Sequence, residues 1–204
     1  MMKNAKIITY SGKMLDIIHP DPKDIDIQDI AHALAYAARF TGHTTRFLSV
    51  ANHSVFVADQ LARTDPSLTL YGLLHDASEA YIHDMATPIK LLPQFNDYRN
   101  VENHLMEAIF SKFNMTWLPE MPAAVRAADA LSLTIEARRF LNHGNMNAWV
   151  ESLPPDPRIP YPVMDMQTSE HIFMRRFNEL FLSVQPEKAP NALSSPPETA
   201  ISIP

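Results

Sequence analysis

The chain has 204 residues, of which 46% are hydrophobic, so it is long enough for one compact domain with a substantial core. A formal net charge of −6 at pH 7 argues against nucleic-acid binding through a basic surface, and the lack of cysteine excludes disulfides and thiolate metal ligands. No apolar run approaches membrane-spanning length, and the first residues lack the apolar core of a signal peptide. We therefore expect a cytoplasmic protein with no nucleic-acid or membrane partner.

The N-terminal part predicts a β-hairpin followed by a helix. Within residues 5–18, two β-branched, apolar stretches flank a Ser-Gly pair that ends at Gly12, which is typical of a short hairpin. After two prolines, Asp24 or Asp26 can cap a helix with apolar residues on one face. Gly42 is expected to end that helix.

The next two predicted helices each carry a histidine among apolar residues. Ser49 is a suitable N-cap for a helix whose apolar stripe contains His53. Asp65, followed by a proline at the first-turn position, is expected to open the helix after it. That helix carries the pair His75-Asp76 at its end.

The C-terminal half predicts three more helices and a loop. A proline-dense stretch at 153–162 is expected to be a loop, and 185–204, rich in Pro, Ser and Ala, is expected to be a disordered tail. The fold class is therefore all-α with a small N-terminal β-hairpin, as a single domain over 1–184. The three helices are expected at 95–113, at 123–142, which contains Asp129, and at 168–184.

Two histidines and two aspartates on three of these helices form a candidate metal site. His53, His75, Asp76 and Asp129 offer imidazole and carboxylate ligands, which suit a divalent Mn, Fe, Co, Ni or Zn ion without choosing among them. Asp129 lies mid-helix among small apolar residues, where a carboxylate is costly unless it has a cationic partner. Glu79 follows Asp76 by three residues, so it lies on the same side and can reach a water at the site.

Each of these residues also has a simpler explanation. An inward histidine such as His53 is more often a hydrogen-bonded core residue than a ligand. Asp76 could be a surface residue at a helix end, and Asp129 could pair with Arg126 on its own helix. The metal interpretation is favoured because the four residues follow one another on three apolar-faced helices.

With these four residues in this order, the chain resembles the HD superfamily of metal-dependent phosphohydrolases. Residues 49–54, Ser-Val-Ala-Asn-His-Ser, resemble the first motif of the bacterial 5′-deoxynucleotidases, and residues 75–90 resemble their second motif almost position for position. The phage triphosphohydrolases that act on dATP are close relatives with the same kind of site. The resemblance covers roughly residues 25–142 and implies an HD-domain helical bundle.

The resemblance implies a role for each matching residue. His53, His75, Asp76 and Asp129 would hold one metal ion, since the additional paired histidines of two-metal relatives are missing. Glu79 would be the acid/base group that positions or deprotonates the attacking water. The implied substrate contacts are Arg39 and Lys90 to phosphate, Asp84 to the sugar, and Phe40 near the sugar or base. His43, in the polar loop after Arg39, is a further candidate for the pocket.

The chain departs from the family pattern at three positions near the substrate. Asn52 stands where a Glu is common, His83 stands where a Gly is common, and Phe40 replaces the Trp of some relatives. These departures concern the substrate pocket more than the metal ligands.

The expected function is metal-dependent hydrolysis of the 5′ phosphate ester of a deoxynucleotide. The products would be the deoxynucleoside plus phosphate, or plus triphosphate from a dNTP such as dATP. One alternative is a phosphodiesterase acting on a cyclic or signalling nucleotide, and another is a non-catalytic helical scaffold stapled by a metal. A homodimer or higher homo-oligomer could pack through 95–113 and 168–184, although burial within the monomer explains those stripes more simply.

Overall fold

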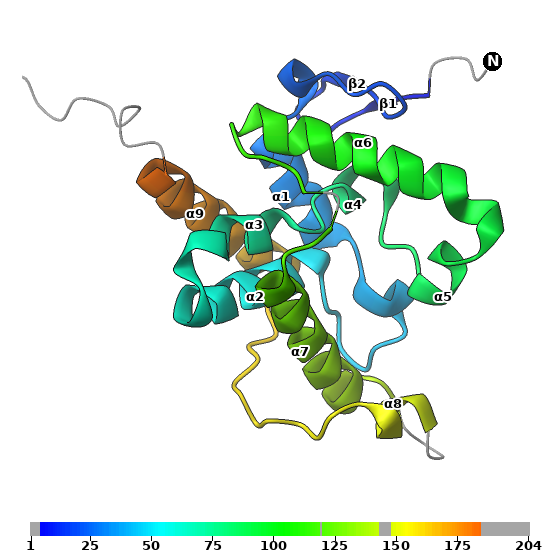
Figure 1. Ribbon diagram of the computed structural model, residues 1–204, viewed down its shortest axis with the longest axis vertical. Coiled ribbons are helices and arrows are strands. Elements are labelled where there is room, and N and C mark those ends of the chain that lie inside the picture. Colours follow the sequence, from blue (N-terminus) through cyan, green and yellow to red (C-terminus); the bar gives the residue numbers. More distant parts are fainter. Residues whose placement is uncertain (1–4, 119, 143–147, 185–204) are drawn as a thin grey trace, which may run out of the picture.

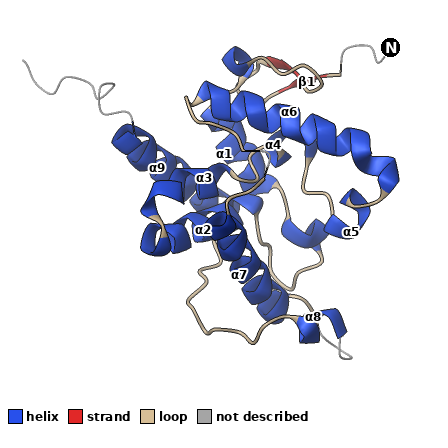
Figure 2. Ribbon diagram, viewed as in Figure 1, coloured by secondary structure: helices blue, strands red, loops and turns tan. Residues whose placement is uncertain are grey.

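The protein is described by a computed structural model that covers residues 5–118, 120–142 and 148–184. It is an all-α bundle with one two-stranded hairpin (Figures 1 and 2), which confirms the expected fold class. In Figure 1 the hairpin and α6 lie at one end of the molecule, and α8 lies at the opposite end. The expected tail at 185–204 lies outside the described residues. Within them, no helix combines the length and apolar character needed to cross a membrane.

The N-terminal hairpin is tied to the first helix through its turn. Strand β1 (Lys6–Ile8) pairs antiparallel with β2 (Met14–Asp16), and Gly12 supplies a φ of 81° in the turn. The backbone and hydroxyl of Ser11 both donate to the carboxylate of Asp29 on helix α1 (Ile27–Tyr36), at 2.5 and 2.9 Å. The predicted hairpin is therefore confirmed. Asp26 caps α1 by accepting from the backbone of Gln28.

Helix α1 ends at Tyr36, so the expectation that it continues to Gly42 is wrong. Ala37 and the residue after it are extended, because the chain there pairs with the segment that enters helix α2 (Val50–Thr64). Arg39 N donates to Leu48 O at 2.9 Å, and Val50 N donates to Ala37 O at 3.0 Å. A short 3-10 turn at Arg39–Gly42 follows. These long-range backbone bonds replace helical ones and direct Arg39 toward the interior.

Helix α2 is the central element of the bundle. Ser49 caps it by accepting from the backbone of Asn52, as predicted. It packs against α3 (Thr69–Leu74), α7 (Ala123–Phe140) and α9 (Met166–Val184). Because neighbours surround it, most of its residues from Val50 to Ala58 are buried, His53 among them.

The pair His75-Asp76 lies in a turn between α3 and α4 (Glu79–Ile82). The expectation that the pair lies on a regular helix is therefore wrong. A 3-10 turn at Pro66–Leu68 precedes α3, so Asp65 does not directly open the helix that leads to the pair. After α3, the backbone tightens through i to i+3 bonds, such as Ala77 N to Leu74 O at 3.0 Å. This tightening changes the direction in which the two side chains point.

The remaining helices follow the prediction closely. After α5 (Thr87–Lys90), helices α6 (Asn96–Lys112), α7 and α9 match the expected 95–113, 123–142 and 168–184, with end shifts of a few residues. Helix α8 (Ala148–Ser152) is an additional short element. Leu105, Ile109 and Phe113 of the α6 stripe are buried within the monomer, which favours the simpler explanation of that stripe.

Candidate metal centre

Three elements bring His53, His75, Asp76 and Asp129 together at one point. The Nε2 atoms of His53 and His75 are 3.3 Å apart, and His53 Nε2 lies 3.2 Å from Asp129 Oδ1. Asp76 Oδ2 lies 3.3 Å from His75 Nε2 and 3.6 Å from His53 Nε2. His53 comes from α2, the adjacent pair from the turn after α3, and Asp129 from α7. The four residues singled out from the sequence therefore converge.

The far nitrogen of each imidazole is fixed by a hydrogen bond. His75 Nδ1 lies 2.7 Å from the carbonyl oxygen of Gly72, which can only accept, so Nδ1 carries the proton. His53 Nδ1 likewise faces Glu136 Oε1 at 2.9 Å. In the neutral rings, both Nε2 atoms then direct a lone pair toward the carboxylates. Such an arrangement of acceptors is unfavourable without a cation and is typical of metal-ligating histidines.

The charges around His53 favour a positive charge at this point. Burial and Arg39 disfavour the charged imidazole, but the carboxylates of Glu136 and Asp129 outweigh them and raise the pKa of His53 to about 10. Burial alone would raise the pKa of Asp129, yet its bond to His53 lowers it to about 2. A proton on His53 Nε2 or a metal ion can supply this charge. The ligand atoms of His53, His75 and Asp129 all lie within 4.8 Å of one another and could hold a metal ion.

Glu136 is a site residue that the sequence interpretation missed. It is fully buried on α7, and it shares one helix face with Asp129 and Ser132 because the three are separated by three and four residues. Its pKa stays well below the usual range because the charges of Arg39 and His53 outweigh the cost of burial. The signal that could have found it is this helical spacing from Asp129.

Arg39 is drawn to the cluster by Glu136. Its Nε and Nη2 donate to Glu136 Oε2 at 3.2 and 3.0 Å, while Nη1 lies 3.9 Å from Asp76 Oδ2. The guanidinium carbon lies 5.6 Å from the centre of the Phe40 ring, within cation–π range. Phe40 therefore lies beside Arg39, and its contact with a sugar or base stays a prediction.

Two bacterial proteins share most of the length of this chain. The uncharacterized protein RCAP_rcc00048 of Rhodobacter capsulatus is 37% identical over 164 residues, which cover 76% of this chain and 83% of that protein. The uncharacterized protein YfdR of Escherichia coli is 33% identical over 176 residues, which cover 85% of this chain and 94% of that protein. The chain belongs to their family. No family model matches the sequence.

In this member of the family, a buried carboxyl lies near the metal-ligand candidates. Glu79 begins α4, and its Oε2 atom has no hydrogen-bond partner among the described residues. Burial, together with the charges of Asp76 and Asp84, raises the pKa of Glu79 well above its usual range. Burial also raises the pKa of Asp84, against the opposing charge of Arg39. Burial therefore shifts Glu79 toward its protonated form, which is the direction that a proton-donating acid/base group requires.

The other two predicted substrate contacts, Lys90 and His43, differ in how far they are buried. Lys90 is half-buried and donates from Nζ to Glu102 Oε1 at 2.7 Å. Although burial opposes its charge, Glu102, Glu79 and Asp76 together raise the pKa of Lys90. His43 is exposed, and its backbone N–H donates to Phe40 O. These contacts do not test the substrate role of His43, which stays a prediction.

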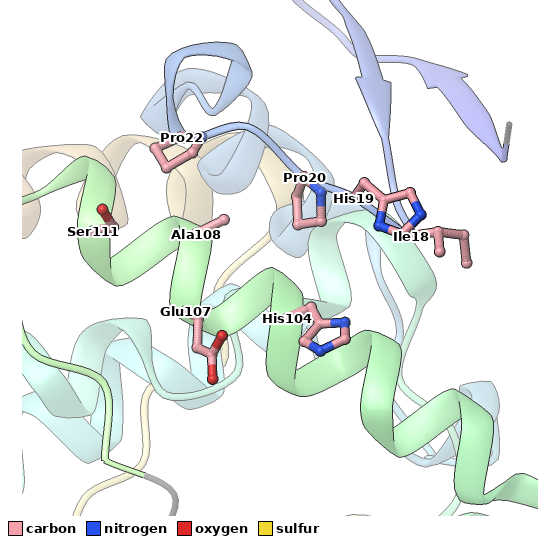
Figure 3. A pocket seen from close by; sticks show the side chains of 8 residues that line it. All are labelled: Ile18, His19, Pro20, Pro22, His104, Glu107, Ala108 and Ser111. Atoms are coloured by element: carbon pink, nitrogen blue, oxygen red, sulfur yellow. The ribbon is translucent and has the colours of Figure 1, made fainter.

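A pocket at another place on the protein does not contain the metal-ligand candidates. It has a volume of about 390 Å³ and lies between α6 and the loop after β2 (Figure 3). His19 and His104 line it from those two elements, but no residue of the metal-ligand cluster does. We regard the cluster as the candidate site because its polar groups are buried and converge, whereas none of the four metal-ligand candidates lines this pocket.

Proposed function

We propose that this protein is an HD-superfamily phosphohydrolase that cleaves the 5′ phosphate ester of a deoxynucleotide. The products would be the deoxynucleoside plus phosphate, or plus triphosphate when the substrate is a dNTP such as dATP. The observation that carries the proposal is the convergence of His53, His75, Asp76 and Asp129. The buried Glu79 accompanies them, and its Oε2 atom has no hydrogen-bond partner within the described part of the chain.

The residues present fit a single divalent metal ion. Two imidazole lone pairs and two carboxylates face one point, which is a nitrogen and oxygen donor set suited to Mn, Co, Fe, Ni or Zn. When bound, such an ion supplies Lewis-acid polarisation of a phosphate oxygen and of the attacking water. Asp76 would be the fourth ligand, on the evidence of its distances to both imidazoles.

Glu79 is the group that would handle the proton in the reaction. Water attacks the α-phosphorus, a new P–O bond forms, and the bond from phosphorus to the 5′ oxygen breaks. A proton leaves the water and a proton reaches the 5′ oxygen, so the reaction needs a nearby group that accepts and returns one. Glu79 is buried, and burial raises its pKa, so it is the group that we assign to this proton exchange. General acid/base catalysis typically contributes about 10²–10⁴-fold.

Arg39 and Lys90 would neutralise the phosphate, and Asp84 would meet the sugar. Nη1 of Arg39 faces the ligand cluster, while its other guanidinium nitrogens are held by Glu136. A fixed guanidinium stabilises charge that develops on phosphate oxygens without having to reorganise. Asp84, close enough for its charge to act on Glu79, would accept from a sugar hydroxyl.

A product assay tests the proposal. Purified protein with Mn²⁺ or Co²⁺ is offered each dNMP and dNTP, and deoxynucleoside, phosphate and triphosphate are resolved by chromatography. Release of a deoxynucleoside with equimolar phosphate or triphosphate is expected. A metal-loaded, folded protein that hydrolyses none of these nucleotides would overturn the proposed activity and leave the phosphodiesterase and the scaffold as the alternatives.

Two variants separate metal binding from chemistry. Asp76→Ala should lose metal content and turnover together, because it removes a ligand. Glu79→Gln should keep the metal and lose turnover by at least about 10²-fold, because the amide cannot exchange the proton. Asp97→Asn, on the exposed first turn of α6, is the matched control that should change neither. Loss of metal from Glu79→Gln would contradict the role given to Glu79.

A further inference from the structure

The buried carboxylate of Glu136 is surrounded entirely by hydrogen-bond donors. Its Oε1 accepts from His53 Nδ1 at 2.9 Å, from Ser132 Oγ at 3.0 Å and from the hydroxyl of Tyr161. Its Oε2 accepts from Nε and Nη2 of Arg39. Both oxygens are thus used, and every partner gives a proton to the carboxylate rather than taking one.

Tyr161 reaches Glu136 from a segment that the sequence marks only as a proline-rich loop. We call residues 153–165 the strap. Arg139 holds it by donating to Asp156 at 2.7 and 2.5 Å and to Ile159 O at 2.9 Å. Farther along, Met164 N donates to the side chain of Asn52 at 2.8 Å. The strap is therefore fixed on both sides of Tyr161, against α7 and α2.

The strap carries Tyr161 into a small core of its own. The Tyr161 ring packs at 4.6 Å from Phe56 and 5.9 Å from Phe140, measured between ring centres. Leu48 and Ile135 complete this buried cluster. Because the ring is held by packing, its hydroxyl is presented to Glu136 in a fixed position, as residues that support a functional site commonly are.

Glu136 also determines how two candidate site residues face the cluster. By accepting from Nδ1, it leaves Nε2 of His53 directed at His75 and Asp129. By accepting from two nitrogens of Arg39, it leaves Nη1 facing Asp76. One carboxylate thus sets the orientation of a metal-ligand candidate and of a phosphate-contact candidate.

We propose that Glu136 is a positioning residue that holds His53 and Arg39 as one unit, with Tyr161 of the strap completing its set of donors. This rests on the proposed function for the identity of what the two residues bind. The strap is then part of the site, and the site extends beyond the region that resembles the HD superfamily.

Glutamine cannot replace Glu136 in this role. Its side-chain amide has one oxygen that accepts and one nitrogen that only donates. Whichever way the amide turns, its NH₂ group faces either the N–H of His53, with the hydroxyls of Ser132 and Tyr161 beside it, or the guanidinium of Arg39. Neither the imidazole N–H nor the guanidinium can accept a hydrogen bond from that group. Glu136→Gln should therefore disturb either metal affinity or phosphate binding while leaving the shape of the side chain unchanged.

The test measures Mn²⁺ affinity by electron paramagnetic resonance and, separately, kcat and KM for the best deoxynucleotide. Glu136→Gln should weaken Mn²⁺ binding by about 10–100-fold, the usual cost of removing such a supporting group, or raise KM with the metal site saturated. Tyr161→Phe keeps the carboxylate and the packing. It should change the same one of the two quantities, Mn²⁺ affinity or KM, by a smaller factor. Glu107→Gln and Tyr36→Phe, both at exposed positions, are the matched controls.

The outcomes separate this proposal from the proposed function. If Glu136→Gln and Tyr161→Phe both match the wild type in Mn²⁺ affinity and KM, the positioning role is overturned. If Glu136→Gln does not fold, Tyr161→Phe alone decides between these results. A wild type that binds Mn²⁺ but hydrolyses no deoxynucleotide would overturn the proposed function alone, because the effect on Mn²⁺ affinity would still be measurable. A wild type that binds none of Mn²⁺, Co²⁺, Fe²⁺, Ni²⁺ and Zn²⁺ would overturn both.

Discussion

Some residues in this protein have a backbone conformation that their residue type rarely adopts, and His83 is the clearest case. Its φ of 69° and ψ of 158° lie in a region of backbone conformation that is essentially restricted to glycine. The residue is exposed, and its carbonyl oxygen accepts from the hydroxyl of Tyr98 at 2.9 Å. The unusual backbone directs the chain from α4 into Asp84.

We predict that His83→Gly stabilises the protein by about 1 kcal/mol. Relief of backbone strain is worth about 1–3 kcal/mol, and the greater entropy of glycine in the unfolded chain removes about 0.5–1 kcal/mol of it. Urea denaturation measures the difference. His104→Gly, at an exposed position inside α6, is the control and should destabilise by about 1 kcal/mol. Equal destabilisation by both substitutions would contradict the assignment of strain to His83.

A second prediction concerns Asp156, which holds the strap to α7. Its hydrogen bonds to Arg139 lower the pKa of Asp156 from 3.8 to about 2. Because the folded-state pKa is the lower one, the ion pair stabilises the fold above pH 4 and loses its effect as the pH falls toward 2. The contribution should be below about 1 kcal/mol, since the pair is partly exposed.

The measurement compares wild type with Asp156→Asn by urea denaturation at several pH values. The wild type should be more stable above pH 4, and the two curves should converge between pH 4 and pH 2. Asp97→Asn, at an exposed position on α6, is the control. A difference that stays constant down to pH 2 would show that the ion pair does not cause it.

At the scale of secondary-structure elements, the contact between α2 and α3 determines where the His75-Asp76 turn lies. Gly72 of α3 packs so closely on α2 that a Cβ atom at this position would overlap Cδ1 of Leu61. The carbonyl oxygen of Gly72 also orients His75 through its Nδ1 atom. The glycine thus serves both the packing of the two helices and the orientation of a metal-ligand candidate.

We predict that Gly72→Ala destabilises the protein by about 1–3 kcal/mol through overpacking. Helix propensity alone predicts the opposite sign, a gain of up to about 1 kcal/mol, so the direction of the change distinguishes the two effects. Thermal or urea denaturation measures it. In a Leu61→Ala background, the penalty should shrink, because the overlapping methyl group is gone. A penalty that is unchanged in that background would rule out the contact with Leu61 as its cause.

At the scale of the whole molecule, the ligand cluster joins segments that are far apart in the chain. His53 and Asp129, for example, lie on α2 and α7, and 76 positions separate them in the sequence (129 minus 53). The unfolded chain cannot hold the ligands together, so a metal that binds the folded site stabilises the fold as a whole.

We predict that Mn²⁺ raises the thermal unfolding temperature of the wild type. At a free Mn²⁺ concentration about 100 times its Kd, the expected stabilisation is about 2.7 kcal/mol. His75→Ala should abolish the shift, because it removes a ligand candidate. His104→Ala, outside the cluster, should keep it. Equal shifts in both variants would mean that Mn²⁺ binds elsewhere on the protein.

Much of the fold and the identity of the metal-ligand candidates followed from local information in the sequence. Apolar periodicity, the caps at Asp26 and Ser49 and the turn at Gly12 depend on neighbouring residues, and the structure confirms them. The donor types of His53, His75, Asp76 and Asp129 are likewise properties of the side chains themselves.

Other features depended on contacts that no local pattern specifies. Helix α1 stops early because its end pairs with the entry to α2. Arg39 faces the cluster because it binds Glu136, 97 residues farther along the chain. The proline-rich strap contributes Tyr161 only because Arg139 and Asn52 hold it against α7 and α2. Sequence periodicity reports which face of an element is buried, whereas the partner buried against it is decided by tertiary packing.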